Sequence, residues 1–302
     1  MIILYYANRA EKSILDPVKV ELDRRKIKNV YIDLSLCVSN IEDDKNLSRV
    51  YDYVFQQLET LPDVRSAIVI GDRREIMFAC LAMFLKDIPV IQLAAGDLSG
   101  EISLVDDYFR HLITVLSKKQ VCFTEKSEIN SNMLLSCLNL KSDSVFLPNP
   151  TLSEIDLHKI NRRRSKTKYD LVLIHPQSLS RHDTREDIRE TKSILDNNKN
   201  TIVIRGNRDK NYDLLHSFWK EIEDCQNVTI HDNLKKQIFI ELLAGCDRFI
   251  TNSSCAFYEA PFFLSEEQIV RIGKRNKNRE IAKYNRNEIK SSQKIVDNIL
   301  KI

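Results

Sequence analysis

Glycine is scarce in this chain, and its scarcity excludes the common glycine-rich phosphate sites. Only six glycines occur among 302 residues, and they form neither GxGxxG nor GxxxxGKS/T. The dinucleotide-binding fingerprint and the P-loop are therefore absent. The GxSxG and HExxH signatures are absent as well. Any phosphate site in this protein must be built from other residues.

Paired cysteines, a dominant charge and long apolar runs are also lacking. The seven cysteines are scattered and never spaced as CxxC, which is typical of free thiols in a reducing compartment and excludes a clustered zinc site. Lys and Arg number 46 against 43 Asp and Glu, so the charge does not favour a nucleic-acid partner. No apolar run approaches the roughly 20 residues of a transmembrane helix, and residues 1–7 resemble a strand more than a signal peptide. We expect a cytoplasmic protein without nucleic-acid or membrane partners.

Short apolar runs alternate with longer amphipathic segments in the first half. Strands are predicted at 2–7, 28–33, 67–71, 89–93, 120–124 and 143–147, and helices over 16–25, 47–61 and 74–86. Runs such as Ala67 to Ile70 are apolar throughout, which indicates strands buried on both faces. Together with the intervening helices, they indicate a parallel sheet.

The pattern changes near residues 148–168, where prolines precede a basic, polar stretch that is typical of a surface connection. A second alternation follows, with strands at 170–174, 201–205, 228–231, 248–251 and 269–272 and helices over 212–223 and 234–243. We therefore predict two Rossmann-like, doubly wound α/β domains facing a cleft. The predicted ranges are 1–155, 169–285, and 286–302 for a closing C-terminal helix.

Acidic residues follow two of the predicted strands in the first domain. Asp72 comes after a buried strand, Asp97 after the next, and the pair Asp106 and Asp107 shortly later. Ligands of open parallel sheets bind beyond the carboxyl ends of strands. Neighbouring carboxylates also raise one another's pKa, which suits proton transfer. Helix capping by Asp72 and helix-start positions for the acidic pair are the competing interpretations.

Polar residues follow three predicted strands of the second domain. His175 ends the first strand and can contact a phosphate or donate a proton, although a polar boundary residue is the simpler interpretation. Ser253 and Ser254 stand at a predicted helix start that can hold a diphosphate, with Glu259 positioned for ribose hydroxyls. A simple N-cap fits the same residues. Arg275 lies in a basic loop that either contacts an anion or is merely solvated.

Taken in order, these blocks resemble the UDP-N-acetylglucosamine 2-epimerase family, particularly its hydrolysing branch. The matching segments are Asn8 to Glu11, Gly71 to Glu75, Ala95 to Thr114, His175 to Pro176, Asn252 to Pro261 and Gly273 to Arg279. The resemblance implies a glycosyltransferase-B type fold with its active site in the interdomain cleft. It also implies that a UDP-linked N-acetyl hexosamine is converted to the C2-epimeric free sugar plus UDP. That reaction proceeds by elimination to a 2-acetamidoglucal and re-addition of water.

The resemblance also assigns residues. No metal or redox cofactor is required by this chemistry. The implied catalytic residues are Asp72, Asp97, Asp107 and His175. The implied substrate- and nucleotide-binding residues are Arg9, Arg73, Glu75, Arg110, Asn252, Ser253, Ser254, Glu259, Arg275 and Arg279.

The chain departs from the family pattern at several positions. Asp97 stands where a glutamate is usual, Cys255 and Ala256 replace Ser-Gly, and Asn278 replaces a glycine. The chain is also short before Gly71. Two alternatives therefore stay open: a nucleotide-sugar-dependent glycosyltransferase, and a nucleotide-sugar binding protein of the same fold with impaired catalysis. The oligomeric state is not readable, and a homodimer is one candidate assembly.

Overall fold

The structure is a computed structural model that describes residues 1–37, 47–99, 105–153, 168–177, 179–206, 210–232, 234–277, 279–284 and 291–301. The chain divides into two compact units. The N-terminal unit comprises Met1–Leu98, Ser103–Glu154 and Tyr284–Ile302, and the C-terminal unit comprises Ser99–Ile102 and Ile155–Lys283. The predicted boundary at 155 and residues 286–290 of the predicted closing segment lie outside the described residues.

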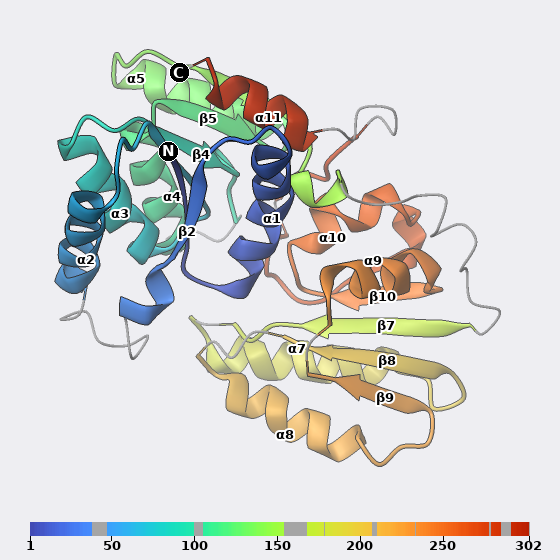
Figure 1. Cartoon of the computed structure of the whole chain (residues 1–302). Helices are drawn as coiled ribbons and strands as arrows, with labels where there is room; N and C mark the ends of the chain where they lie inside the picture. Colours follow the sequence, from blue (N-terminus) through green and yellow to red (C-terminus); the bar gives the residue numbers. More distant parts are fainter. Residues whose placement is uncertain are drawn as a thin grey trace. The chain divides into compact units, whose positions relative to one another are not determined.

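The N-terminal unit is built on a six-stranded parallel sheet (Figure 1). Its strands are β1 (Ile2–Tyr6), β2 (Asn29–Asp33), β3 (Ser66–Ile70), β4 (Val90–Leu93), β5 (Lys119–Cys122) and β6 (Ser144–Phe146). All six predicted strands are confirmed. The spatial order β2-β1-β3-β4-β5-β6 reverses direction at β1. The topological switch point of this sheet therefore lies between β1 and β3, where open α/β sheets bind ligands.

Helices of the N-terminal unit follow the strands in alternation. They are α1 (Arg9–Arg24), α2 (Leu47–Thr60), α3 (Arg74–Leu85), α4 (Val105–Leu116), α5 (Glu125–Cys137) and α11 (Ser291–Ile299).

The predicted start of α1 at Asp16 is wrong. The helix begins at Arg9 because the Asn8 side chain caps it by accepting the Glu11 N–H at 2.9 Å. At its other end, Arg25 pairs with Asp297 of α11 at 2.5 Å, within the same unit.

The C-terminal unit contains a second parallel sheet (Figure 1). Its strands are β7 (Tyr169–Ile174), β8 (Asn200–Arg205), β9 (Val228–His231), β10 (Arg248–Thr251) and β11 (Ile269–Arg271), and its helices are α7 (Arg181–Ile194), α8 (Tyr212–Ile222), α9 (Lys236–Gly245) and α10 (Cys255–Tyr258). All five predicted strands are confirmed here as well. The order β11-β10-β7-β8-β9 places the switch point between β7 and β10.

Apolar cores cover both faces of the second sheet. Leu171 and Phe249 belong to one buried cluster, whereas Val172 and Ile250 belong to another that includes Trp219 of α8. Because neighbouring strand residues point to opposite faces, the sheet is covered on both sides, as a doubly wound α/β unit requires. The prediction of two α/β domains of the doubly wound type is confirmed.

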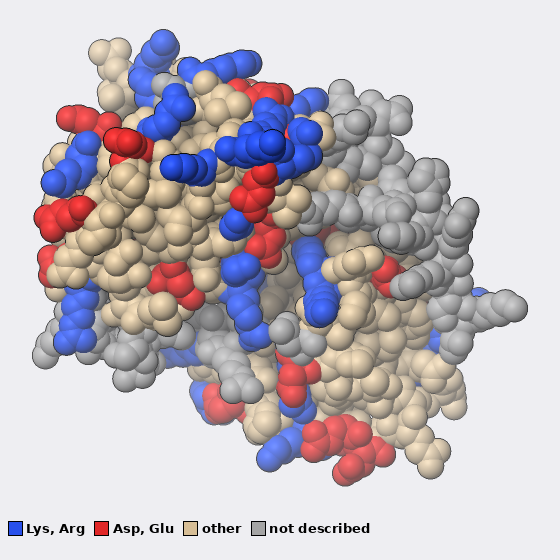
Figure 2. Space-filling model, in the orientation of Figure 1, with Lys and Arg blue, Asp and Glu red and all other residues tan. Residues whose placement is uncertain are grey.

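Two expectations from composition can be checked within the described residues. All seven cysteines are free. None of the described helices combines the length and apolarity needed to cross a bilayer. On the face shown in Figure 2, acidic and basic side chains lie interspersed on both units.

Candidate active site

Arg110 joins two of the predicted carboxylates in the N-terminal unit. The Arg110 side chain is 3% exposed, and its guanidinium donates to Asp97 Oδ2 at 2.8 Å and forms a short ion pair with Asp72. Asp72 follows β3 and Asp97 follows β4, so both stand at the carboxyl edge of the sheet. From the sequence we expected neighbouring carboxylates to raise one another's pKa. The structure instead places a cation between these two, which balances both charges.

A tight turn after β4 positions Asp97. Gly96 has a φ of +67°, and a Cβ there would lie 1.9 Å from the Ser127 carbonyl oxygen, so only glycine fits. Asn130 on α5 secures this turn by donating to the Gly96 carbonyl at 3.0 Å. Asp97 is consequently 5% exposed. Asp72 is more accessible, with 31% of its side chain exposed.

The Gln92 side chain of β4 orients α4. Gln92 is fully buried, donates to the Arg110 carbonyl at 3.1 Å and accepts from Thr114 at 2.8 Å. These bonds fix the helix that carries Arg110. The sequence analysis did not single out Gln92, although a polar residue inside the apolar run 89–93 was a visible signal.

Glu11 is a second buried group that the residue-by-residue prediction did not assign. Its Oε2 accepts the Ala7 N–H at 2.6 Å, and its Oε1 has no hydrogen-bond partner among the described residues. A Cβ on Gly71 would lie 3.0 Å from that oxygen. Burial raises the pKa of Glu11 to about 8, against the opposing effects of the Ala7 amide and Arg73. Glu11 is therefore mainly neutral at pH 7, at the switch point of the sheet.

The remaining predicted residues of this unit differ in exposure. Glu75 is buried and lies 3.4 Å from Arg73 Nε. Arg9 is exposed at the first position of α1, and Asp107 is partly exposed in the first turn of α4. The structure thus joins Asp72, Asp97 and Arg110 directly, with Asp107 one turn before Arg110 on the same helix.

In the C-terminal unit, Asn252 binds the main chain of His175. Asn252 Oδ1 accepts the His175 N–H at 2.8 Å, and its Nδ2 donates to the His175 carbonyl at 2.8 Å. His175 follows β7 and Asn252 follows β10, the two strands that flank the switch point. The side-chain amide therefore holds together the ends of the two strands between which ligands bind in this fold.

Asp187 of α7 supports this pair and was missed by the sequence analysis. It is 2% exposed, and its Oδ2 accepts from Asn252 Nδ2 and from Gln177 Nε2, both at 2.9 Å. No local signal marks it, because Asp187 lies in a helix with many charged residues, where an acid usually faces solvent. Its burial depends on contacts with distant loops.

His175 is partly buried, and the positive charge that acts on it is that of Arg275. Burial, helped by the nearby Arg275 charge, lowers the pKa of His175 to about 3. The imidazole is therefore neutral at pH 7 and can donate one N–H. Arg275 itself donates to the Pro176 carbonyl at 2.7 Å. Arg279 donates to the Tyr258 hydroxyl at 3.2 Å, with its guanidinium 5.6 Å from the ring centroid.

The helix expected after Asn252 is short. The segment α10 has four residues and is followed by a 3-10 turn at Ala260–Phe262, because Pro261 cannot donate a helical hydrogen bond. The dipole of so short a helix is small, so phosphate binding here would depend on local N–H and hydroxyl groups. Ser253 is buried and Ser254 is partly buried at its start.

Glu259 is buried and paired with a lysine that the sequence analysis did not select. Lys236, at the start of α9, lies 2.9 Å from Glu259 Oε1 and is 32% exposed. This pair compensates the buried charge and leaves the other carboxylate oxygen to accept further hydrogen bonds. No cluster of three or more potential metal ligands occurs in the described part of the chain.

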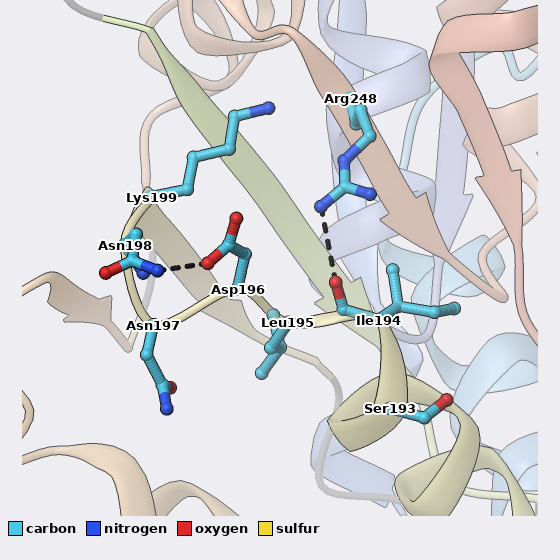
Figure 3. A pocket seen from close by; sticks show the side chains of 8 residues that line it. All are labelled: Ser193, Ile194, Leu195, Asp196, Asn197, Asn198, Lys199 and Arg248. Carbon is cyan, nitrogen blue, oxygen red and sulfur yellow. Dashed lines mark hydrogen bonds between the residues drawn. The ribbon is translucent and has the colours of Figure 1, made fainter.

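A cavity of about 670 Å³ lies at the opposite, amino-terminal edge of the second sheet (Figure 3). It is lined by the α7–β8 connection, including Asp196 and Lys199, and by Arg248 at the start of β10. Lys199 lies 2.7 Å from the buried Asp170, and Arg248 is also paired with that carboxylate. Because its cations are already neutralised and it lies away from the switch point, we do not assign the nucleotide to it.

Two doubly wound parallel units, each with polar loops at its switch point, define a two-domain α/β protein of the glycosyltransferase-B type. The sequence pattern of the family described as UDP-N-acetylglucosamine 2-epimerase matches residues 26–302. The chain belongs to this family.

Known relatives agree with this assignment. The chain is 27% identical over 264 residues to the GDP/UDP-N,N'-diacetylbacillosamine 2-epimerase (hydrolyzing) of Campylobacter jejuni, which covers 82% of this chain and 64% of the relative. It is 29% identical over 230 residues to the UDP-N,N'-diacetylbacillosamine 2-epimerase (hydrolyzing) of Legionella pneumophila, covering 72% of this chain and 58% of the relative. The match thus spans less than two thirds of either relative.

Solved structures show the same fold. The UDP-GlcNAc 2-epimerase of Methanocaldococcus jannaschii, in complex with UDP-GlcNAc and UDP, superposes with a TM-score of 0.74 at 14% identity, covering 100% of this chain and 99% of that one. The Neisseria meningitidis enzyme bound to UDP-GlcNAc gives 0.73 at 16% identity, with 100% of both chains covered. At such low identity the likeness establishes the fold alone.

Proposed function

We propose that this chain is a hydrolysing nucleotide-sugar 2-epimerase, which converts a UDP-linked N-acetyl hexosamine to the C2-epimeric free sugar and UDP. Family membership and the hydrolysing relatives support this function over a glycosyltransferase of the same fold. The observation that carries the proposal is the buried Arg110 with Asp72 and Asp97 on either side of it. This arrangement supplies charged carboxylates and a fixed cation at a ligand-binding edge.

The reaction needs a base for the C2 proton and a site for the departing diphosphate. A carboxylate removes the proton from C2 while the C1–oxygen bond to UDP breaks, which gives the glycal. Water then adds at C1, and a proton returns to C2 from the opposite face. We assign proton movement to Asp72, Asp97 and Asp107. The partial exposure of the Asp72 side chain supports its access to substrate.

We assign nucleotide binding to the C-terminal unit. Ser253, Ser254, Arg275 and Arg279 supply N–H, hydroxyl and guanidinium donors for the diphosphate. The neutral imidazole of His175 contributes an N–H donor. The second oxygen of Glu259 accepts ribose hydroxyls. The location of these loops beside the β7–β10 switch point supports the assignment.

The names of the relatives suggest which sugars to test. UDP-N-acetylglucosamine, UDP-N,N'-diacetylbacillosamine and its GDP counterpart should be incubated separately with the protein. Chromatography would follow the nucleoside diphosphate, and mass spectrometry with NMR would follow the free sugar. We expect UDP and one C2-epimeric sugar in equal amounts from at least one substrate. Absence of both products across the panel would overturn the proposal.

Two further properties remain proposals. The unpaired cysteines support a reducing, cytoplasmic location. We also propose a homodimer, which sedimentation would test against the 35.2 kDa mass of one chain. A single-chain mass at working concentration would contradict it.

A further inference from the structure

One buried carboxylate of the C-terminal unit, that of Asp187, contacts three loops to which we assign nucleotide binding. Asp187 Oδ2 accepts from Gln177, two residues after His175, and from Asn252 in the loop after β10. Its Oδ1 faces Gly273, the residue that begins the basic loop after β11. A Cβ at Gly273 would lie 1.9 Å from that oxygen. Asp187 therefore touches the loops that follow β7, β10 and β11.

The contact with Asn252 determines which way the asparagine amide points. A carboxylate accepts hydrogen bonds and cannot donate them when ionised, so the Asn252 NH2 group must face Asp187. That orientation also aims Nδ2 at the His175 carbonyl and Oδ1 at the His175 N–H. A flipped amide would place oxygen against both Asp187 and the carbonyl, and both bonds to His175 would be lost.

The burial of Asp187 is costly unless its bonds are made. Burial raises the pKa of Asp187 to about 6, and the donors Asn252 and Gln177 oppose that rise. The group is therefore mainly ionised at pH 8. The side-chain amides of Gln177 and Asn252 donate to its carboxylate and so compensate part of the cost of burial.

We propose that Asp187 is a positioning residue of the nucleotide site, which orients the Asn252 amide and so fixes the loops that receive the diphosphate. This inference rests on the proposed nucleotide binding. Asp187 does not itself contact the ligand. It acts through Asn252, whose amide hydrogens are both used inside the protein.

The chain provides a matched control in Asp170. Asp170 is also an aspartate with no exposed surface in the same unit, but it lies near the amino end of β7 and pairs with Lys199 and Arg248. Asp187→Asn and Asp170→Asn both remove one buried charge without changing size. If Asp187 only stabilised the fold, the two substitutions would act alike on ligand binding.

The test measures UDP affinity by calorimetry at pH 8 and the unfolding midpoint of each variant. We expect Asp187→Asn to weaken UDP binding about ten-fold, the effect of losing one charge-assisted hydrogen bond. Asp170→Asn should leave UDP affinity within about two-fold of wild type, whatever its effect on stability. Equal UDP affinity in Asp187→Asn and wild type would overturn the inference, and so would an equal loss in both variants.

A double-mutant cycle tests the route through Asn252. In an Asn252→Ala background, Asp187→Asn should cost little further affinity, because the amide that it orients is gone. Additive losses would contradict the proposed route. If Asp187→Asn does not fold, the variant to measure is Gln177→Ala, which removes the other amide donor to Asp187. It should weaken UDP binding by a few-fold. Unchanged UDP affinity in this variant would overturn the inference. Failure of the wild type to bind UDP would be distinguishable, because it would overturn the nucleotide assignment itself.

Discussion

Arg110 and Asp97 form a buried ion pair, with the guanidinium Nη1 2.8 Å from the carboxylate Oδ2. Nη2 of the same guanidinium pairs with Asp72, so one side chain from α4 fixes the carboxylates that follow two neighbouring strands. A planar fork with several donors can make both contacts at once. This relationship gives the proposed chemistry its fixed geometry.

Arg110→Lys should separate charge from geometry. A lysine ammonium retains the charge, but it cannot span both carboxylates as the guanidinium does. We expect turnover to fall at least about ten-fold and stability to drop by roughly 1–3 kcal/mol, because one buried acceptor loses its partner. Steady-state kinetics and denaturant unfolding measure the two effects. Wild-type turnover in this variant would show that the bridge is dispensable.

Asp97→Asn should impair chemistry while sparing the nucleotide. The amide keeps the size of the carboxylate but cannot accept a proton, so kcat should fall by about 10²–10⁴-fold if Asp97 moves the C2 proton. UDP affinity, measured by calorimetry, should stay within about two-fold of wild type. Because the variant also loses the charge that faces Arg110, its unfolding midpoint must be recorded alongside. Loss of UDP binding in a folded Asp97→Asn protein would refute this division of roles.

Glu259→Gln should weaken UDP binding and largely spare turnover. An amide accepts ribose hydroxyl bonds less well than a carboxylate, so UDP affinity should fall about ten- to a hundred-fold, corresponding to roughly 1.5–3 kcal/mol. Turnover at saturating substrate should change much less. Lys236→Met provides the control, since it breaks the ion pair with Glu259 and keeps the carboxylate. UDP binding by Glu259→Gln at wild-type strength would remove Glu259 from the ribose site.

Glu11 should make folding stability depend on pH in a recognisable direction. Its pKa rises from an ordinary value of 4.5 to about 8 in the folded chain because of burial. Below pH 4.5 Glu11 is protonated in both the folded and the unfolded protein. Between pH 4.5 and 8 it is protonated in the folded protein only, so the free energy of unfolding decreases as pH rises through that window. Glu11→Gln, which resembles the neutral acid, should flatten this loss. Denaturant unfolding from pH 5 to 9 measures it.

Glu21 of the same helix is the control for this prediction. Hydrogen bonds from Arg24, and then from Arg25, lower the pKa of Glu21 to about 2. Its stabilising effect is present above pH 4.5 and is lost as pH falls toward 2, in the opposite window. Glu21→Gln should therefore leave the slope between pH 5 and 9 unchanged. An identical slope in Glu11→Gln and wild type would mean that Glu11 is ionised in the folded protein.

Apolar periodicity predicted the strands because burial on both faces leaves a strong local pattern, as in Ala67 to Ile70. Strand ends then indicated Asp72, Asp97 and His175, since residues beyond parallel strands share one edge, and the family resemblance added Asn252. The partners of these residues were not predictable in the same way. Asp187 lies in a helix with many charged residues, where an acidic side chain usually faces solvent. Its role depends on its hydrogen bond with Asn252, which is 65 residues away in the sequence.

The start of α1 shows another limit of local patterns. Asn8 caps the helix through one side-chain bond, and Pro17 lies inside it. A proline is usually found in the first turn of a helix or at a break, whereas Pro17 lies two turns after the start of α1. The motif that contains Arg9 consequently lies on a helix, and this places Glu11 beside Gly71.

The most direct test of the central claim is the fate of the C2 proton in deuterium oxide. Elimination and re-addition require the C2–hydrogen bond to break and a solvent hydron to enter at C2. With a UDP-linked N-acetyl hexosamine that the protein consumes, we predict release of UDP and a free, C2-inverted sugar that carries one deuterium at C2 by NMR and mass spectrometry. Release of a sugar that retains its original C2 hydrogen and configuration would contradict the account.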